Sequence, residues 1–420
     1  MHYPEFFADK LATLKKEGRY RYFLTHRRSA EHFPQLCYTD EAGQSRQAVN
    51  WCSNDYLGMS TEATVIARMT GVARKSGTGS GGTRNISGTT GWHRELENLL
   101  ADWHNKEAAL LFNGAYQANV TTLQTLGRQI PGLVFLSDEK NHASIIEGIR
   151  GCRNEKKIFR HNDMDHLASL LQELPAGQPR LIVFETVYSM CGTLAPVRDI
   201  TALARKYNAL TYADEVHAVG LYGPSGAGIL EQEGLQADVD IVNGTLSKAI
   251  GVFGGYIAAS ALLVDFIRSF GSGFIFTSSL PPAVCAAAAA SIKHIQANEK
   301  LRRVFFRNVT ALRNALKKAA IPCRENRSHI TILPVGNALH CRRLADTLLR
   351  DHGIYLQPIN YPTVPEGEEC LRLIITARHE SRQIHHLAYC LKRVLYGDDP
   401  ADRSAFAAFP AAAGDSETLY

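Results

Sequence analysis

Two short segments each end an apolar strand in residues that can carry chemistry. Residues 240–256 read DIVNGTLSKAIGVFGGY, so Lys248 follows the strand and precedes a run of small residues. Residues 210–220 read LTYADEVHAVG, in which Asp214 closes a second strand and His217 follows. A lysine that forms a Schiff base must be neutral part of the time, which burial and nearby cations favour. An acid at a strand end can hold a pyridine nitrogen protonated, which makes the ring an electron sink. Alone, Lys248 also fits a solvated loop, but together the segments favour a pyridoxal phosphate site.

Glycine-containing segments earlier in the chain are suited to bind an anionic ligand. Residues 76–89 read SGTGSGGTRNISGT and combine glycines, hydroxyls and an arginine. A flexible linker is the alternative interpretation. The apolar strand 108–112 runs into residues 113–116 (NGAY), where a helix begins, and a helix start favours phosphate through its N–H groups and dipole. His142 begins a later helix, where it caps the helix, packs in the core or, beside a pyridoxal ring, lies flat against it.

These residues require a sheet whose strand ends meet at one edge. From residue 95 onward, apolar strands alternate with helical patterns, which predicts parallel βαβ units in an α/β fold. The 420 residues, 45% hydrophobic and 21% charged, are enough for more than one domain. We expect a helix and arm over residues 1–48, a large domain over 49–295, a smaller α+β domain over 296–398 and a disordered tail over 399–420.

Composition and motifs disfavour several other classes of protein. The nine cysteines are scattered without C-x-x-C, which disfavours a disulfide framework and a zinc site. The pair His385-His386 lacks a matching acid, so we expect no metal. The net charge of +5 is spread along the chain, so we expect no nucleic-acid binding, although it would attract a polyanion such as coenzyme A. No apolar tract is long enough for a bilayer, and residues 1–7 resemble neither a signal nor a transit peptide, which predicts a cytoplasmic protein without membrane contact.

Several motifs together resemble a known family. In chain order they read GRYRYF, WCSNDYLGM, GSGGTRNISGT, NHASIIEGIR, FRHND, YADEVHAVGLYGP, FIFTSSLPP and GIYLQPINYPTVP. They resemble the α-oxoamine synthases, fold-type I pyridoxal-phosphate enzymes that condense an amino acid with an acyl-CoA and release carbon dioxide. The resemblance covers nearly all of residues 1–395. It implies a mostly parallel seven-stranded sheet flanked by helices, and a homodimer with active sites at the subunit interface. The branch most similar to this chain condenses glycine with succinyl-CoA to 5-aminolevulinate, the first step of tetrapyrrole and heme biosynthesis.

The resemblance also assigns roles to individual residues. Lys248 would carry the cofactor and remove a proton from glycine, Asp214 would pair with the pyridine nitrogen, and His217 with the ring's phenolic oxygen. Other contacts to the cofactor are implied for Gly114, Ala115, Tyr116, His142, Ser189, Thr245 and, from the other subunit, Thr277 and Ser278. Contacts that orient glycine are implied for Asn54, Ser189 and Arg372. Contacts to the acyl-CoA are implied for Arg21, Thr83, Asn85, Ile86, Ser137, Lys156 and Thr363, with Ile86 limiting chain length.

The sequence departs from the family pattern at three places. The family's M-D-G is Met190-Cys191-Gly192 here, its G-P-R-G-G-G is GPSGAG at 223–228, and its T-P-[ST]-P is IITA at 374–377. Four alternatives remain open. They are a sister enzyme that uses acetyl-CoA and needs no carboxylate pocket, a synthase that supplies a specialised pathway, a non-catalytic subunit of the same fold, and a dinucleotide-binding oxidoreductase. Lys248 disfavours the non-catalytic subunit, and the lack of a strand running into G-x-G-x-x-G disfavours the oxidoreductase.

Overall fold

The central element of the fold is a seven-stranded sheet with strand order β4-β10-β9-β8-β7-β5-β6. The structure is a computed structural model that describes residues 1–397, so the tail predicted over 399–420 lies outside the described residues. The strands are β4 (Ala108–Phe112), β5 (Val134–Asp138), β6 (Lys156–Phe159), β7 (Arg180–Glu185), β8 (Leu210–Asp214), β9 (Ile241–Thr245) and β10 (Gly255–Ala259). Strand β10 runs antiparallel to both of its neighbours, β4 and β9, and the other neighbouring pairs in this sheet are parallel. The predicted α/β class and mostly parallel sheet are confirmed.

Helices cover both faces of the sheet because alternate strand residues are apolar on each face. In β4, Leu110 belongs to one buried cluster and Leu111 to the other. The first cluster lies under α4 (Ala115–Gln129), α5 (Ala143–Arg150), α9 (Ala261–Phe270) and α10 (Ser272–Ile275). The second lies under α3 (Gly91–Trp103), α6 (Met164–Gln172), α7 (Val197–Tyr207), α8 (Ile229–Glu233) and α11 (Pro282–Ala297). The sheet is therefore buried on both sides, and its strand ends are the places where polar side chains can gather.

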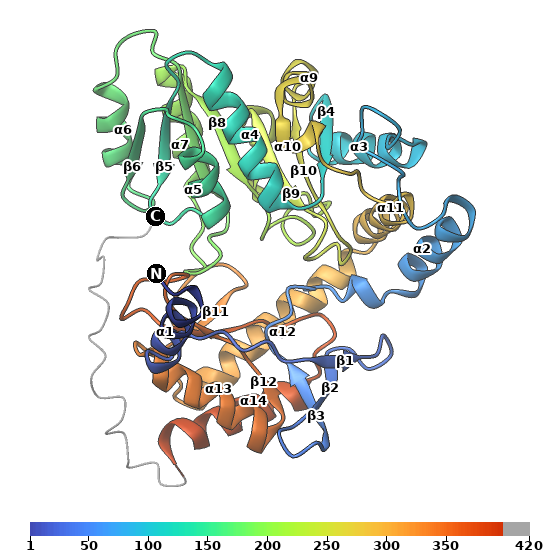
Figure 1. Cartoon of the computed structure of the whole chain (residues 1–420), viewed down its shortest axis with the longest axis vertical. Coiled ribbons are helices and arrows are strands. Elements are labelled where there is room, and N and C mark those ends of the chain that lie inside the picture. The colour runs from blue at the N-terminus through green and yellow to red at the C-terminus, as the bar shows by residue number, and fades with distance from the viewer. Residues whose placement is uncertain (398–420) are drawn as a thin grey trace.

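The C-terminal part forms a second layer of helices on small sheets, in the lower half of Figure 1. Its helices are α12 (Glu299–Lys318), α13 (Ala338–His352) and α14 (Ser381–Tyr396). One sheet has the order β11-β14-β13, made of Thr331–Pro334, Cys370–Leu373 and Pro358–Ile359. The short strand β12 (Ile354–Tyr355) precedes β13 along the chain. No helix within residues 1–397 combines the length and the apolar character that crossing a membrane requires.

The N-terminal segment joins the C-terminal part through a four-stranded sheet. Strands β1 (His26–Arg28), β2 (Gln35–Thr39) and β3 (Ser45–Asn50) form it with β12, which pairs parallel with β3. Residues on both sides of the boundary predicted at 48/49 thus lie in one strand, which pairs with the C-terminal part. The remaining helices are α1 (Tyr3–Lys16), η1 (Met59–Thr61), α2 (Ala63–Ser76) and η2 (Gln236–Asp238). The helix predicted within residues 1–48 forms as α1, and none of its residues is buried.

Candidate active site

Strands β8 and β9 are neighbours, so the two segments with candidate chemistry meet at one sheet edge. Asp214, the last residue of β8, lies opposite Asn243 of β9. Lys248 follows β9 by three residues, and its Nζ lies 2.7 Å from His217 Nε2. The sequence predicted this adjacency because parallel strands end at the same edge.

The surroundings of Lys248 lower the pKa of its amine, so that it loses its proton near neutral pH. Burial, and after it the guanidinium of Arg372, lower the pKa of Lys248 to about 7, against smaller opposing effects of Asp214 and Glu185. Glu185 does not balance the lysine with a full charge, because burial and then Asp214 raise its pKa well above the usual value. Near pH 7 about half of the Lys248 amines therefore carry no proton, which is the state that attacks a carbonyl carbon.

The carboxylate of Asp214 is fixed by groups from two directions. Asn119 Nδ2, in α4, donates to Asp214 Oδ2 at 2.7 Å, and the backbone N–H of Val216 donates to Oδ1 at 2.9 Å. The hydroxyl of Tyr212 donates to Asn119 Oδ1 at 2.7 Å, which orients the amide. Asn119 Nδ2 also donates to Ser144 Oγ at 2.9 Å. Helix α4, which packs against the sheet, therefore fixes the orientation of the Asp214 carboxylate through Asn119.

His142 joins the same network. Its Nδ1 lies 2.7 Å from Ser144 Oγ and caps the start of α5. Its ring meets Tyr116 edge to face, with centroids 6.3 Å apart. Burial lowers the pKa of His142, so the ring is neutral at pH 7 and can stack on another ring.

His217 is neutral and bridges Lys248 to a buried tyrosine that the sequence analysis did not single out. Burial, followed by the charge of Lys248, lowers the pKa of His217 well below its usual value. The hydroxyl of Tyr56 is hydrogen bonded to His217 Nδ1 at 2.8 Å. The same hydroxyl accepts from Arg372 Nη2 at 3.4 Å and lies 3.3 Å from Asn54 Oδ1, so its proton has two acceptors in reach, this oxygen and the closer His217 Nδ1.

Arg372, in β14, brings the C-terminal part into the site. Its Nη2 donates to Asn54 Oδ1 at 3.1 Å. Its Nε is buried and has no hydrogen-bond partner among the described residues. Because an unpaired buried donor is costly, this nitrogen is suited to receive an oxygen of a bound carboxylate.

The start of α4 offers donors for a phosphate. The backbone N–H groups of Ala115 and Tyr116 stand in the first turn, where a helix supplies no partner. Gly255 in β10 permits the close packing of this turn, since a Cβ there would lie 2.1 Å from Ala115 N. Thr245, buried at the end of β9, donates its hydroxyl to Gly254 O at 3.2 Å. This end of the site is positioned by backbone rather than by cations, a pattern suited to a phosphate monoester.

Ser189 stands at the sheet edge next to these groups. Its backbone N–H donates to Glu185 Oε2 at 3.3 Å, and the residue is buried. The polar groups described so far supply what pyridoxal phosphate needs. These are an amine that is neutral near pH 7, a carboxylate at a strand end, a neutral imidazole and helix N–H donors.

The predicted acyl-CoA residues form two separate groups within the chain. Arg21 Nη2 donates to Thr363 Oγ1 at 3.2 Å. Thr83 Oγ1 donates to Asn85 Oδ1 at 2.7 Å, and Thr83 forms an isolated β-bridge with Ser278. No hydrogen bond among the described residues joins one group to the other.

The structure also describes the surroundings of four other predicted site residues. Ile86 is 81% exposed, and Thr277 Oγ1 accepts from Gln117 Nε2 at 2.9 Å. Ser137 is buried and accepts from Asn141 Nδ2 at 2.9 Å. Lys156 is exposed and begins β6, two residues before the position opposite Ser137.

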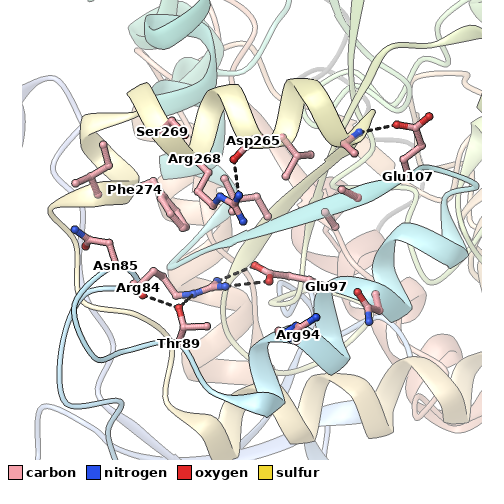
Figure 2. A pocket seen from close by; sticks show the side chains of 17 residues that line it. Arg84, Asn85, Thr89, Arg94, Glu97, Glu107, Asp265, Arg268, Ser269 and Phe274 are labelled. Carbon is pink, nitrogen blue, oxygen red and sulfur yellow. Dashed lines mark hydrogen bonds and ion pairs between the residues drawn. The ribbon is translucent and has the colours of Figure 1, made fainter.

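A cavity of about 930 Å³ opens beside the Thr83–Ile86 segment (Figure 2). Arg84 and Glu97 both line the cavity, and the two Nη atoms of Arg84 donate to the two carboxylate oxygens of Glu97, at 2.7 and 2.9 Å. Of the predicted site residues only Asn85 lines this cavity, so it is separate from the sheet edge that carries Lys248. Within residues 1–397, no three His, Cys, Asp or Glu side chains come together as a metal site.

At two of the places where the sequence departs from the family pattern, the residue found here forms its own hydrogen bonds. Ser225 Oγ accepts from Trp103 Nε1 at 2.9 Å, and its backbone N–H donates to the carboxylate of Glu231. Ile374 is buried, and its backbone N–H donates to Trp51 O at 2.7 Å, which ties the segment after β14 to the strand-end segment before Asn54.

Comparisons with known proteins agree with this geometry. The model of the family described as "Aminotransferase class I and II" matches residues 46–391. The 5-aminolevulinate synthase of Paracoccus denitrificans is 49% identical over 410 residues, which cover 97% of this chain and 100% of that protein. The synthase of Bradyrhizobium diazoefficiens is 47% identical over 394 residues, covering 94% and 96%. The solved structure of Sphingomonas wittichii serine palmitoyltransferase has a TM-score of 0.84 and 29% identity over 93% of this chain and 96% of that one. The chain therefore belongs to the class I and II aminotransferase family and, within it, to the 5-aminolevulinate synthases.

Proposed function

We propose that this chain condenses glycine with succinyl-CoA to 5-aminolevulinate, coenzyme A and carbon dioxide, with pyridoxal phosphate as cofactor. The observation that carries the proposal is the partly buried amine of Lys248, with its pKa lowered to about 7, 2.7 Å from His217. The relatives named above support the choice of reaction.

The cofactor, when bound, supplies an electron sink for negative charge on the Cα of glycine. Lys248 takes the Cα proton. With a pKa of about 7, its amine is basic enough to accept a proton and is unprotonated in about half of the molecules near pH 7. Asp214, with its oxygens held by Asn119 and Val216, keeps the ring nitrogen protonated. The N–H groups at the start of α4 would bind the phosphate, and His142 would pack against the ring.

Glycine is oriented by Arg372 and its partner Asn54. The unpaired Nε of Arg372 and its Nη groups bind the glycine carboxylate, while Asn54 Oδ1 holds the guanidinium in place. His217 then polarises the thioester carbonyl. Its Nδ1 is anchored to Tyr56, so Nε2 is the nitrogen that faces the reacting atoms.

The succinyl carboxylate is the feature that separates this substrate from acetyl-CoA. Arg21 is exposed and hydrogen bonded to Thr363, so it offers a cation held in place by a hydroxyl. Thr83 and Asn85 offer further polar groups, and Ile86 an apolar wall. Because the two groups are separate within one chain, we propose that a second subunit brings one of them to the other.

We also propose that the protein is a homodimer. Ile86 and Phe276 are 81% and 80% exposed, and the Thr83–Ser278 bridge brings their segments together. Leu262 and Phe270 of α9 are likewise exposed, and α9 lines the same cavity as Asn85 (Figure 2). Large apolar side chains gathered beside a cavity are typical of a subunit interface. All nine cysteines are free thiols, which supports our proposal of a reducing, cytoplasmic location.

The test is a comparison of acyl-CoAs. The purified, cofactor-loaded protein is supplied with glycine and succinyl-, acetyl- or longer acyl-CoA, and the amino ketone is identified. We expect kcat/KM for succinyl-CoA to exceed that for acetyl-CoA at least tenfold, since a charged pocket contributes more than about 1.4 kcal/mol of discrimination. Arg21→Gln should erase most of that preference, whereas Arg27→Gln, on the exposed strand β1, should keep it. Equal use of acetyl-CoA by the unaltered protein would refute the succinyl assignment.

A further inference from the structure

A cluster of one thiol, one hydroxyl, one imidazole and one carboxylate lies where the loop after β7, which carries Cys191 and Thr193, meets His161 after β6 and Asp138 at the end of β5. The loop folds back on itself, because Val187 bridges Leu194 and the N–H of residue 188 donates to the carbonyl of residue 193 at 3.0 Å. This turn places Cys191 Sγ 2.9 Å from Thr193 Oγ1. Thr193 Oγ1 in turn lies 2.7 Å from His161 Nε2. The direct distance from Sγ to Nε2 is 3.8 Å.

The far side of the imidazole is held by a buried acid. His161 Nδ1 lies 2.9 Å from Asp138 Oδ1, and the side chains of His161 and Asp138 are 12% and 0% exposed. Asp138 also accepts backbone N–H groups from Lys140 at 2.8 Å and from Asn162 at 3.0 Å. A carboxylate in this setting fixes the proton on Nδ1, so Nε2 is the nitrogen that exchanges a proton with the hydroxyl.

The four groups form a relay that is hydrogen bonded in both of its states. With a neutral thiol, S–H donates to Thr193 Oγ1, and the threonine O–H donates to His161 Nε2. Transfer of one proton along this path leaves a thiolate and an imidazolium. Nε2–H then donates to Thr193 Oγ1, and the threonine O–H donates to the sulfur. Neither state leaves a polar group unpaired, so the charged pair carries no desolvation penalty from a lost hydrogen bond.

The surrounding charges favour the thiolate. Burial alone would raise the pKa of Cys191, but the hydrogen bonds from His161 and Thr193 outweigh it and hold that pKa below its usual value. Burial would lower the pKa of His161, but Asp138 and Cys191 raise it to about 9. Glu185 and Tyr188 also face the cluster, and burial raises the pKa of both, so neither adds a negative charge at neutral pH. The carboxylate of Glu139 contacts the cluster through the backbone N–H of His161, which donates to its Oε1 at 3.0 Å.

We propose that Cys191 is an oxidative modification site that reacts as a thiolate with hydroperoxides. The thiol is partly exposed, whereas Asp138 behind it is fully buried, so the sulfur is the part of the cluster that a small oxidant reaches. The sulfur attacks the terminal oxygen of the peroxide, an S–O bond forms and the O–O bond breaks. The sulfur loses two electrons to the peroxide, and the imidazolium of His161 passes one proton through Thr193 to the leaving oxygen. With hydrogen peroxide the products are a sulfenic acid, water and a neutral imidazole.

The test measures this reaction on the cofactor-loaded full chain at pH 6.5. Equimolar hydrogen peroxide is added in the presence of dimedone, and labelled cysteines are identified by peptide mass spectrometry. Cys37 is the matched control, because it is exposed on β2 and its thiol has no histidine or acid hydrogen bonded to it among residues 1–397. An ordinary thiol is only about 1% thiolate at pH 6.5. We expect Cys191 to be labelled at least tenfold more than Cys37, and equal labelling would overturn the proposal.

A second experiment tests whether Cys191 is reactive because of the His161–Thr193 relay or only because its thiol is accessible. His161→Gln keeps a polar side chain but removes the base, so iodoacetamide should alkylate Cys191 at least tenfold more slowly than in the unaltered protein at pH 6.5. At pH 10, where thiols ionise without help, the two rates should agree within about twofold. Thr193→Val provides the same comparison if the glutamine variant does not fold. An unchanged rate at pH 6.5, or an equal loss at both pH values, would contradict the relay.

Discussion

Replacement of Arg372 by glutamine should raise the KM for glycine by about two orders of magnitude. Arg372 has a buried Nε without a partner among the described residues, and its Nη2 is already held by Asn54. A glycine carboxylate bound by two nitrogens of this guanidinium gains two charge-assisted hydrogen bonds, each worth about 1.5 kcal/mol at the low end. Their loss, about 3 kcal/mol, corresponds to a factor of about 10².

The assay measures coenzyme A release at saturating succinyl-CoA over a range of glycine concentrations. The control is Arg378→Gln, six residues along the chain, whose Nη2 forms an ion pair with Glu62 at 3.0 Å with the arginine side chain 40% exposed. A surface pair of this kind is worth at most about 1 kcal/mol and lies outside the proposed glycine site, so its loss should leave the KM for glycine within twofold.

The same substitution has a second readout. Because the Arg372 charge is one cause of the lowered pKa of Lys248, its removal should raise that pKa above about 7. The pH at which Lys248 becomes half reactive toward an acylating reagent, measured in the cofactor-free protein, should move upward by a corresponding amount. An unchanged glycine KM together with an unmoved pH profile would refute the placement of Arg372 beside both substrate and lysine.

Three further predictions concern the frame of the site. Asn119→Ala removes the donor at 2.7 Å from Asp214, so the Kd for pyridoxal phosphate in equilibrium dialysis should rise about tenfold; an unchanged Kd would contradict the positioning role. Gly251→Ala should lower the urea unfolding free energy by about 1 kcal/mol more than Gly43→Ala, because both have positive φ but only a Cβ at 251 would meet a backbone nitrogen, at 2.3 Å. Lys248 binds a proton less readily in the folded than in the unfolded state. Cofactor-free protein should therefore gain up to about 1.4 kcal/mol of stability per pH unit between about pH 7 and the usual lysine pKa of about 10.4, and Lys248→Met should lose that slope.

The sequence predicted the parts of the site that follow strand ends. Lys248 and Asp214 follow apolar strands of a βαβ pattern, and neighbouring parallel strands end at one edge, so their meeting could be inferred without coordinates. The start of α4 was likewise visible as a strand running into small residues. Local pattern was enough in these cases because each element positions its own residue.

The residues that were missed depend on contacts between distant segments. Tyr56 stands in the N-D-Y-L-G segment, yet its contact with His217 spans 161 positions in the sequence. Asn119 lies on the buried face of α4, where its spacing resembles that of a core residue. The pairing of β3 with β12 is equally remote, and no local signal announces it. Periodicity reports which face is buried and leaves open what lies against it.

The most direct test of the account is to locate the cofactor. The purified holoenzyme is reduced with borohydride, digested, and searched by mass spectrometry for the peptide that carries a phosphopyridoxyl group. The account predicts that this group is found on Lys248, in the segment after β9, and that Lys248→Ala yields no such peptide and no aminolevulinate from glycine and succinyl-CoA. A phosphopyridoxyl group on a different lysine, or full synthase turnover by the alanine variant, would contradict it.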